Sequence, residues 1–262
     1  MDYQDYCRLT GDQVDRFVSL ISAADWATPV ATCPGWNLAK LVGHVGAVQR
    51  WATETVRTSA AERPRMRRFT DTIPSDVDAL PGWLAQGAEQ LLDVLRTASP
   101  DQPVWAWGPD QHVRFWPRRM LHEVAVHRLD AALALAAGDV TAALAAEDTG
   151  TARTIADDGI GEFLTNVPSA QWVPGASAVN GDGRTLDLAA SDTGATWRIA
   201  LQETGYTWQR REAGAAEPAY EADATATAPV VELYLFMYGR VPPRAVAGDA
   251  ELLSRWTAAT PL

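Results

Sequence analysis

Residues 118–135 read RRMLHEVAVHRLDAALAL, and this stretch decides how the N-terminal half of the chain is interpreted. Glu123 and His127 are four residues apart, which on a helix puts both side chains on one face, about one turn from each other. The pattern predicts a helix from about residue 117 to residue 137, with Gly138 as a suitable stop. A carboxylate and an imidazole at this spacing can reach the same cation.

A second helix is expected to supply a third ligand. Residues 32–52, TCPGWNLAKLVGHVGAVQRWA, are periodically apolar, and His44 lies at the edge of their apolar stripe. Asn37 is a suitable N-cap for this helix, because its side chain can accept a hydrogen bond from an otherwise unpaired amide. Two imidazoles and one carboxylate are the usual protein ligands of a catalytic zinc or a related divalent ion, with one position left open. The predicted metal ligands are His44, Glu123 and His127.

Two other interpretations of these residues need to be weighed. The zinc-protease pattern H-E-x-x-H fails, because His122 and His127 are five residues apart and point about 140° away from each other on a helix. Alternatively, His44 and His127 are separate histidines at the edge of the core, and Glu123 is a solvated or ion-paired acid. The spacing alone leaves this alternative open.

The rest of the chain predicts an α+β protein with two domains, at residues 1–145 and 146–262. The first domain is expected to be a bundle of four helices, and the second begins with a bridging helix and continues as short alternating runs between glycine-bearing turns. The expected helices cover residues 5–24, 37–57, 75–98, 117–137 and 147–164, and then the segments APVVELYLFMYGR (228–240) and DAELLSRW (249–256). The expected strands are 184–190, 195–202, 206–211 and 219–227.

Between the third and fourth helices lies a loop too rich in proline, glycine and tryptophan to be helical. Its aromatic residues are expected to cover the end of the bundle, in preference to contacting a substrate. They are Trp105, Trp107, Phe115 and Trp116. His112 in the same loop is not a predicted ligand. Cys33, just before Pro34, is interpreted as an ordinary reduced thiol, with a nucleophilic role as the weaker alternative.

Composition limits the classes of partner. The formal net charge of −11 and the pI of about 4.8 argue against nucleic acid as a partner. No apolar run approaches the length of a membrane span, and the N-terminus lacks a signal-like core, so a cytoplasmic location is expected. Two cysteines are too few for a disulfide framework. Twenty-one arginines against the single Lys40 suggest a high-GC genome, such as that of an actinobacterium.

Several of these motifs resemble the mycothiol-dependent maleylpyruvate isomerase family, within the wider DinB-like metal-binding bundles. In that family a Pro-Gly-Trp precedes the helix with the first histidine, and an E-x-x-x-H-R-x-D string carries the other two ligands. The matching residues here are Pro34, Gly35, Trp36 and His44, then Glu123, His127, Arg128 and Asp130. The tail from about residue 221, with LYLFMYGRVPP and GDAELLSRW, resembles the family's second, sterol-carrier-like α+β domain.

The resemblance implies a reaction. It implies a divalent metal, with zinc expected, and mycothiol as a thiol cofactor that adds to a small electrophile. If the thiol leaves again after bond rotation the enzyme is a cis-trans isomerase, and if it stays the enzyme is an S-transferase. The resemblance also suggests Arg240 as a contact to an anionic substrate or to the thiol, against a structural role at a helix end, and Asp130 as a residue that orients a ligand or pairs with Arg128. The alternatives are a metal-dependent hydrolase and a binding protein without turnover.

Overall fold

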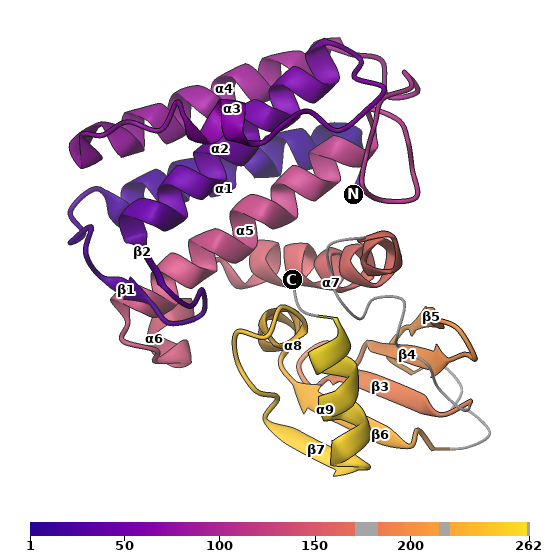
Figure 1. The fold of residues 1–262 in the computed structure, drawn as a ribbon. Helices are drawn as coiled ribbons and strands as arrows, with labels where there is room; N and C mark the ends of the chain where they lie inside the picture. The colour runs from indigo at the N-terminus through magenta and orange to yellow at the C-terminus, as the bar shows by residue number, and fades with distance from the viewer. Residues whose placement is uncertain (171–182, 215–220, 261–262) are drawn as a thin grey trace. The chain divides into compact units, whose positions relative to one another are not determined.

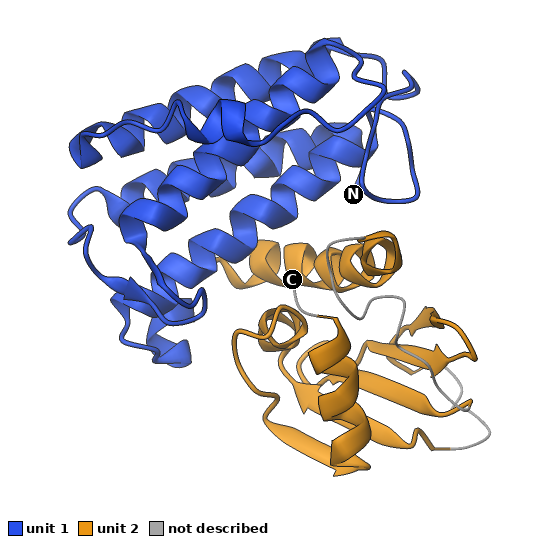
Figure 2. Ribbon diagram, in the orientation of Figure 1, with its two compact units in different colours: residues 1–147 blue, residues 148–262 orange. Residues whose placement is uncertain are grey.

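The computed structural model describes residues 1–170, 183–214 and 221–260 (Figure 1). The chain divides into two compact units, Met1–Glu147 and Asp148–Leu262 (Figure 2). The first is helical apart from two very short strands, and the second contains a five-stranded sheet. The predicted α+β class is therefore confirmed. Among the described residues, no helix has both the length and the apolar character that crossing a membrane requires.

Four long helices form the first unit. They are α1 (Tyr3–Ile21), α2 (Leu38–Arg57), α4 (Leu80–Thr97) and α5 (Phe115–Leu135). Helices α1 and α2 each contact both α4 and α5, so the four helices close around a common core (Figure 1). The short elements are β1 (Pro29–Val30), β2 (Trp36–Asn37), α3 (Arg67–Thr70), the 3₁₀ turn η1 (Val77–Ala79) and α6 (Val140–Leu144).

Local chemistry explains where these helices begin. Asn37 accepts a hydrogen bond from the Lys40 amide at 3.0 Å, which confirms the predicted N-cap of α2. Helix α5 begins at Phe115, two residues earlier than predicted, because Pro117 is tolerated in the first turn of a helix. The predicted start of the third helix at residue 75 is wrong, since the 3₁₀ turn η1 precedes α4 and Pro81 falls in the first turn of α4.

The core of the first unit consists of two apolar clusters. One includes Phe17, Leu41 and Val124, and it contains Cys33 as well. The other contains Trp116, which is fully buried, with Trp105 and Trp107 packed against it. The loop aromatics thus cover apolar surface, as expected, and large buried rings contribute strongly to such a cluster.

The second unit begins with α7 (Thr149–Asn166) and the 3₁₀ turn η2 (Val167–Ser169). Its sheet has the order β5-β4-β3-β6-β7, in which only the β3 and β6 pair is parallel. Helix α8 contacts β3 and β6, and α9 contacts β6. The strands are β3 (Thr185–Ala190), β4 (Thr196–Leu201), β5 (Tyr206–Arg211), β6 (Ala224–Ala228) and β7 (Ala245–Gly248), and the helices are α8 (Val230–Met237) and α9 (Ala250–Ala259).

Two details of this unit differ from the sequence prediction. The strand expected over 219–227 begins at Ala224, and residues 219 and 220 lie outside the described part of the chain. Strand β7 was not predicted, because its sequence, AVAG, has no alternation of apolar and polar residues.

Candidate metal centre

The three predicted ligands lie together between α2 and α5. His44 comes from α2, and Glu123 and His127 come from successive turns of α5, which contacts α2. Glu123 Oε1 lies 3.0 Å from His44 Nε2 and 3.5 Å from His127 Nε2. One donor atom of each residue lies within 4.8 Å of the other two. The prediction that a facing helix would bring His44 to the Glu123 and His127 pair thus agrees with the geometry.

The exposure of the three side chains decreases across the cluster. The side chain of His44 is 36% exposed, that of Glu123 17% and that of His127 10%. His44 is therefore the most exposed member of the cluster and His127 the most buried.

The charges of the cluster depend on one another. Burial by itself raises the pKa of Glu123, but hydrogen bonds from His127 and His44 outweigh burial and hold that pKa well below its usual value. Burial lowers the pKa of His127, and its hydrogen bonds to Asp130, Cys33 and Glu123 outweigh this effect, so the pKa of His127 is raised. Glu123 is therefore an anion that the two imidazoles share.

Asp130 fixes the orientation of His127. Its Oδ2 lies 2.8 Å from His127 Nδ1, and Asp130 is fully buried. A hydrogen bond at Nδ1 leaves Nε2 as the nitrogen that faces Glu123 and a cation. Cys33, buried beside them, donates from Sγ to the same Asp130 oxygen at 3.4 Å. Arg128, the alternative partner expected for Asp130, pairs with Glu147.

A second set of potential ligands shares His127. Cys33, His127 and Asp130 also bring one donor atom each within 4.8 Å of one another. This set uses Nδ1 of His127, whereas the first set uses Nε2. All three residues of the second set are buried. The first set is thus the better candidate for a site that exchanges ligands with solvent.

Two residues complete the surroundings of the cluster. Arg119 donates from Nη2 to Glu123 Oε2 at 3.2 Å, so the carboxylate is held by Arg119 at one oxygen and by the imidazoles at the other. The ring of Trp36 lies 4.9 Å from that of His44 and is stacked 6.2 Å from that of His127. Arg119 was not among the predicted site residues, although its position four residues before Glu123 on the same helix could have indicated it.

The other candidate residues lie elsewhere. His112 is paired with Asp110 at 2.7 Å in the loop before α5. Arg240 belongs to the second unit, in the turn after α8, where its Nη1 donates to the Tyr238 carbonyl at 2.5 Å and its guanidinium lies 5.8 Å from the Tyr238 ring centre. A bond of this kind, to a carbonyl near the end of a helix, is what the structural role weighed above requires, and the binding role of Arg240 stays a prediction.

Fold and site together define a class: a helical-bundle protein with a three-residue cluster of metal-ligand type in its N-terminal unit, followed by an α+β unit. Residues 7–132 match the family described as the mycothiol maleylpyruvate isomerase N-terminal domain. The match covers most of the first unit and confirms the resemblance seen in the sequence.

Solved structures extend the likeness in fold. The crystal structure of a mycothiol-dependent maleylpyruvate isomerase matches with a TM-score of 0.58 at 14% sequence identity, covering 92% of this chain and 90% of that one. A mutant of a mycothiol-dependent maleylpyruvate isomerase, with a histidine replaced by alanine, matches with the same TM-score at 13% identity and the same coverage. At these identities the likeness concerns the fold. A comparison with curated proteins finds no match.

Proposed function

We propose that this protein is a divalent-metal-dependent enzyme that uses a low-molecular-weight thiol, mycothiol, to act on a small electrophile. Its reaction is a cis-trans isomerisation or an S-transfer of the maleylpyruvate isomerase type, in the cytoplasm of an actinobacterium. The observation that carries the proposal is the convergence of His44, Glu123 and His127 on one point. The match of residues 7–132 to the mycothiol maleylpyruvate isomerase N-terminal domain supports the choice of thiol.

The donor atoms fit a metal ion. With metal–ligand bonds of about 2.0–2.1 Å, neighbouring donors around a tetrahedral zinc are about 3.3 Å apart. The two distances from Glu123 Oε1, 3.0 Å to His44 Nε2 and 3.5 Å to His127 Nε2, lie on either side of this value. Two nitrogens and one oxygen suit zinc best among the common divalent ions and leave one position open.

When bound, a divalent ion would supply the Lewis acidity that turns a thiol into its reactive thiolate near neutral pH. The chain's own residues would hold the ion, and they orient its ligands. His44, Glu123 and His127 would bind the ion, Asp130 keeps Nε2 of His127 directed at it, and Arg119 restrains the second oxygen of Glu123.

A second proposal concerns substrate recognition by Arg240. Arg240 is proposed to bind an anionic group of the substrate or of the thiol, because a guanidinium offers a fork of donors that suits a carboxylate. The test is a change of Arg240 to Gln, which should raise KM for an anionic substrate and leave the metal content unchanged.

The metal content of the purified protein tests the main proposal. Wild-type protein should retain about one zinc per chain and consume free thiol in the presence of a maleyl substrate. His127→Ala should lose both properties, whereas His112→Ala is the matched control, a histidine paired with an aspartate outside the cluster, and should keep both. Full metal content and turnover in His127→Ala would contradict the proposal. Hydrolysis without thiol would favour a hydrolase, and ligand binding indifferent to metal would favour a binding protein.

A further inference from the structure

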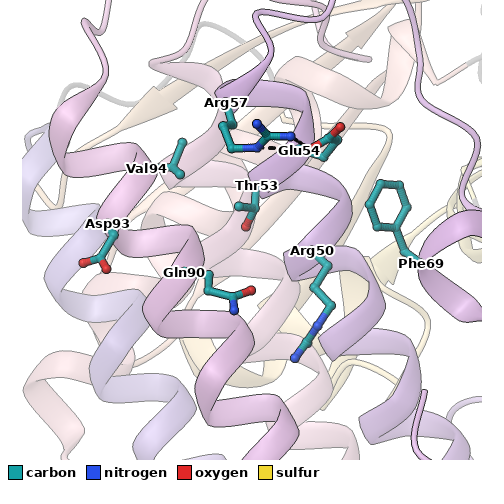
Figure 3. A pocket seen from close by; sticks show the side chains of 8 residues that line it. All are labelled: Arg50, Thr53, Glu54, Arg57, Phe69, Gln90, Asp93 and Val94. Carbon is teal, nitrogen blue, oxygen red and sulfur yellow. Dashed lines mark hydrogen bonds and ion pairs between the residues drawn. The ribbon is translucent and has the colours of Figure 1, made fainter. Parts of the chain in front are cut away.

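A second candidate site lies on another side of α2. A pocket of about 440 Å³ is formed by residues of α2, α3 and α4 (Figure 3). Thr53, which lines it, follows His44 by nine residues, which on a helix is about 180° around the axis. None of its lining residues belongs to the metal cluster. The pocket is therefore separate from the site proposed above.

The guanidinium of Arg50 is fixed at this pocket. Its Nη1 donates to the Gly46 carbonyl at 3.0 Å, and its Nη2 donates to the Trp83 carbonyl at 2.8 Å. The same guanidinium lies 3.8 Å from the centre of the Trp83 ring, a favourable cation–π distance. A side chain with four rotatable bonds is thus held in one place before any ligand arrives.

Two buried glycines leave the room for this arrangement. A Cβ at Gly87, inside α4, would lie 2.5 Å from Arg50 Nη1. A Cβ at Gly46, inside α2, would overlap the Trp83 ring on which Arg50 rests. Glycine is the poorest helix former after proline, so two glycines in helix interiors are a cost to helix stability. Here both make the position of Arg50 possible.

The charge of Arg50 is not balanced by an acid. Among the residues that the structure describes, no carboxylate lies within ion-pair distance of Arg50, whereas Arg57 in the same pocket is paired with Glu54 (Figure 3). Burial lowers the pKa of Arg50 to about 10. Its partners are neutral carbonyls and a ring. An anion in the pocket would supply the missing charge.

The rest of the lining is part apolar and part polar. Phe69 from α3 and Val94 from α4 provide apolar walls (Figure 3). Besides Arg50, the polar lining residues are Thr53, Glu54, Arg57, Gln90 and Asp93. The volume is in the lower part of the range that small-molecule pockets occupy, about 300–1,000 Å³. We propose that this pocket binds a small organic acid, with its carboxylate on Arg50 and its apolar body against Phe69 and Val94.

The test compares 3-phenylpropionate with its neutral amide, 3-phenylpropionamide, by calorimetry and by NMR shifts of the Phe69 and Trp83 rings. The acid should bind saturably and shift both rings, and the amide should bind at least about tenfold more weakly, since a charge-assisted hydrogen bond is lost. The proposed metal centre and Arg240 are the other places where a carboxylate is expected to bind, so the measurements are repeated in His127→Ala and in Arg240→Gln protein. Binding should persist in both.

Two variants locate the binding on Arg50. Arg50→Gln should weaken 3-phenylpropionate binding about tenfold or more. Arg57→Gln, the matched control, removes a paired guanidinium from the same pocket and should change the affinity less than about threefold. Equal affinity for acid and amide, loss of binding in His127→Ala or in Arg240→Gln, or an unchanged affinity in Arg50→Gln would each overturn the proposal. Since the comparison of acid with amide uses wild-type protein, it decides the matter even if Arg50→Gln fails to fold.

Discussion

His127 and Arg128 are neighbours in α5, both buried, and they enter two different polar clusters. Arg128 donates through Nη1 and Nη2 to the two oxygens of Glu147, at 2.6 and 2.8 Å, and through Nε to Gln13 at 2.8 Å. Arg16 adds a second cation, 3.1 Å from Glu147. In this cluster each of these contacts pairs a donor with an acceptor, and the charges of Arg128 and Glu147 cancel.

The cluster of His127 has a different balance. Two imidazole nitrogens, those of His44 and His127, face one oxygen of Glu123. These nitrogens hold the carboxylate by hydrogen bonds, and after loss of the bonding protons the same nitrogens and oxygen could bind one cation instead. The comparison teaches that burial of charged groups does not by itself mark a functional site. What distinguishes the cluster of His127 is that its contacting atoms, two imidazole nitrogens and one carboxylate oxygen, are of types that bind a divalent ion.

The largest expected effect comes from breaking the matched cluster. Arg128→Ala should lower the free energy of unfolding by about 3 kcal/mol, because removal of one partner of a buried ion pair leaves the other without its counter-ion. Arg16 stays beside Glu147, which keeps the loss at the lower end of the usual range. Chemical denaturation measures it. Zinc affinity should stay within about threefold of wild type, and a large loss of zinc would show that the two clusters are not independent.

The next prediction concerns the cluster of His44, Glu123 and His127. His44→Ala should weaken zinc binding by about 100-fold or more, equivalent to about 2.7 kcal/mol, since one of three ligands is lost. The unfolding free energy of the metal-free protein should change by less than about 1 kcal/mol, because the His44 side chain is 36% exposed. Competition with a chromophoric chelator gives the affinity. Destabilisation of the metal-free protein to the extent seen in Arg128→Ala would remove the distinction between the clusters.

A change at Asp130 tests whether the orientation of His127 affects zinc binding separately from the loss of a ligand. Asp130→Asn keeps the size of the side chain and removes its charge, and zinc affinity should fall about tenfold, as for other residues that orient a histidine ligand. The ¹⁵N chemical shifts of His127 should show a mixed tautomer, which a purely structural role would not produce. Asp12→Asn is the control, an exposed aspartate paired with Arg8. Unchanged His127 shifts would contradict the positioning role.

The sequence alone predicted much of this arrangement. The spacing of Glu123 and His127 and the apolar stripe around His44 were enough to expect that two helices would face each other at these residues. The contact of Asp130 with His127 was one of the two alternatives expected for Asp130. The partners of Arg128 were not predictable, because only the fold brings Glu147 and Gln13 to it.

The pocket at Arg50 was not predicted for a similar reason. Gly46 and Gly87 are 41 residues apart in the sequence and belong to different helices. Neither helix alone shows that its glycine makes room for a side chain of the other helix. Periodicity predicts which face of a helix is buried, but the close approach of two helices depends on the pair.

The smallest effect is expected from a change at Cys33. Its thiol donates to Asp130 at 3.4 Å, and a thiol is a weak donor, so Cys33→Ser should change zinc affinity by less than about threefold. Thiol-dependent turnover should also persist, because the proposed reacting sulfur belongs to the cofactor and Cys33 is buried. The measurement is the rate of thiol consumption in protein with its zinc content verified. Loss of turnover at full zinc content would indicate that Cys33 is the nucleophile. The reacting sulfur would then belong to the chain and not to the cofactor.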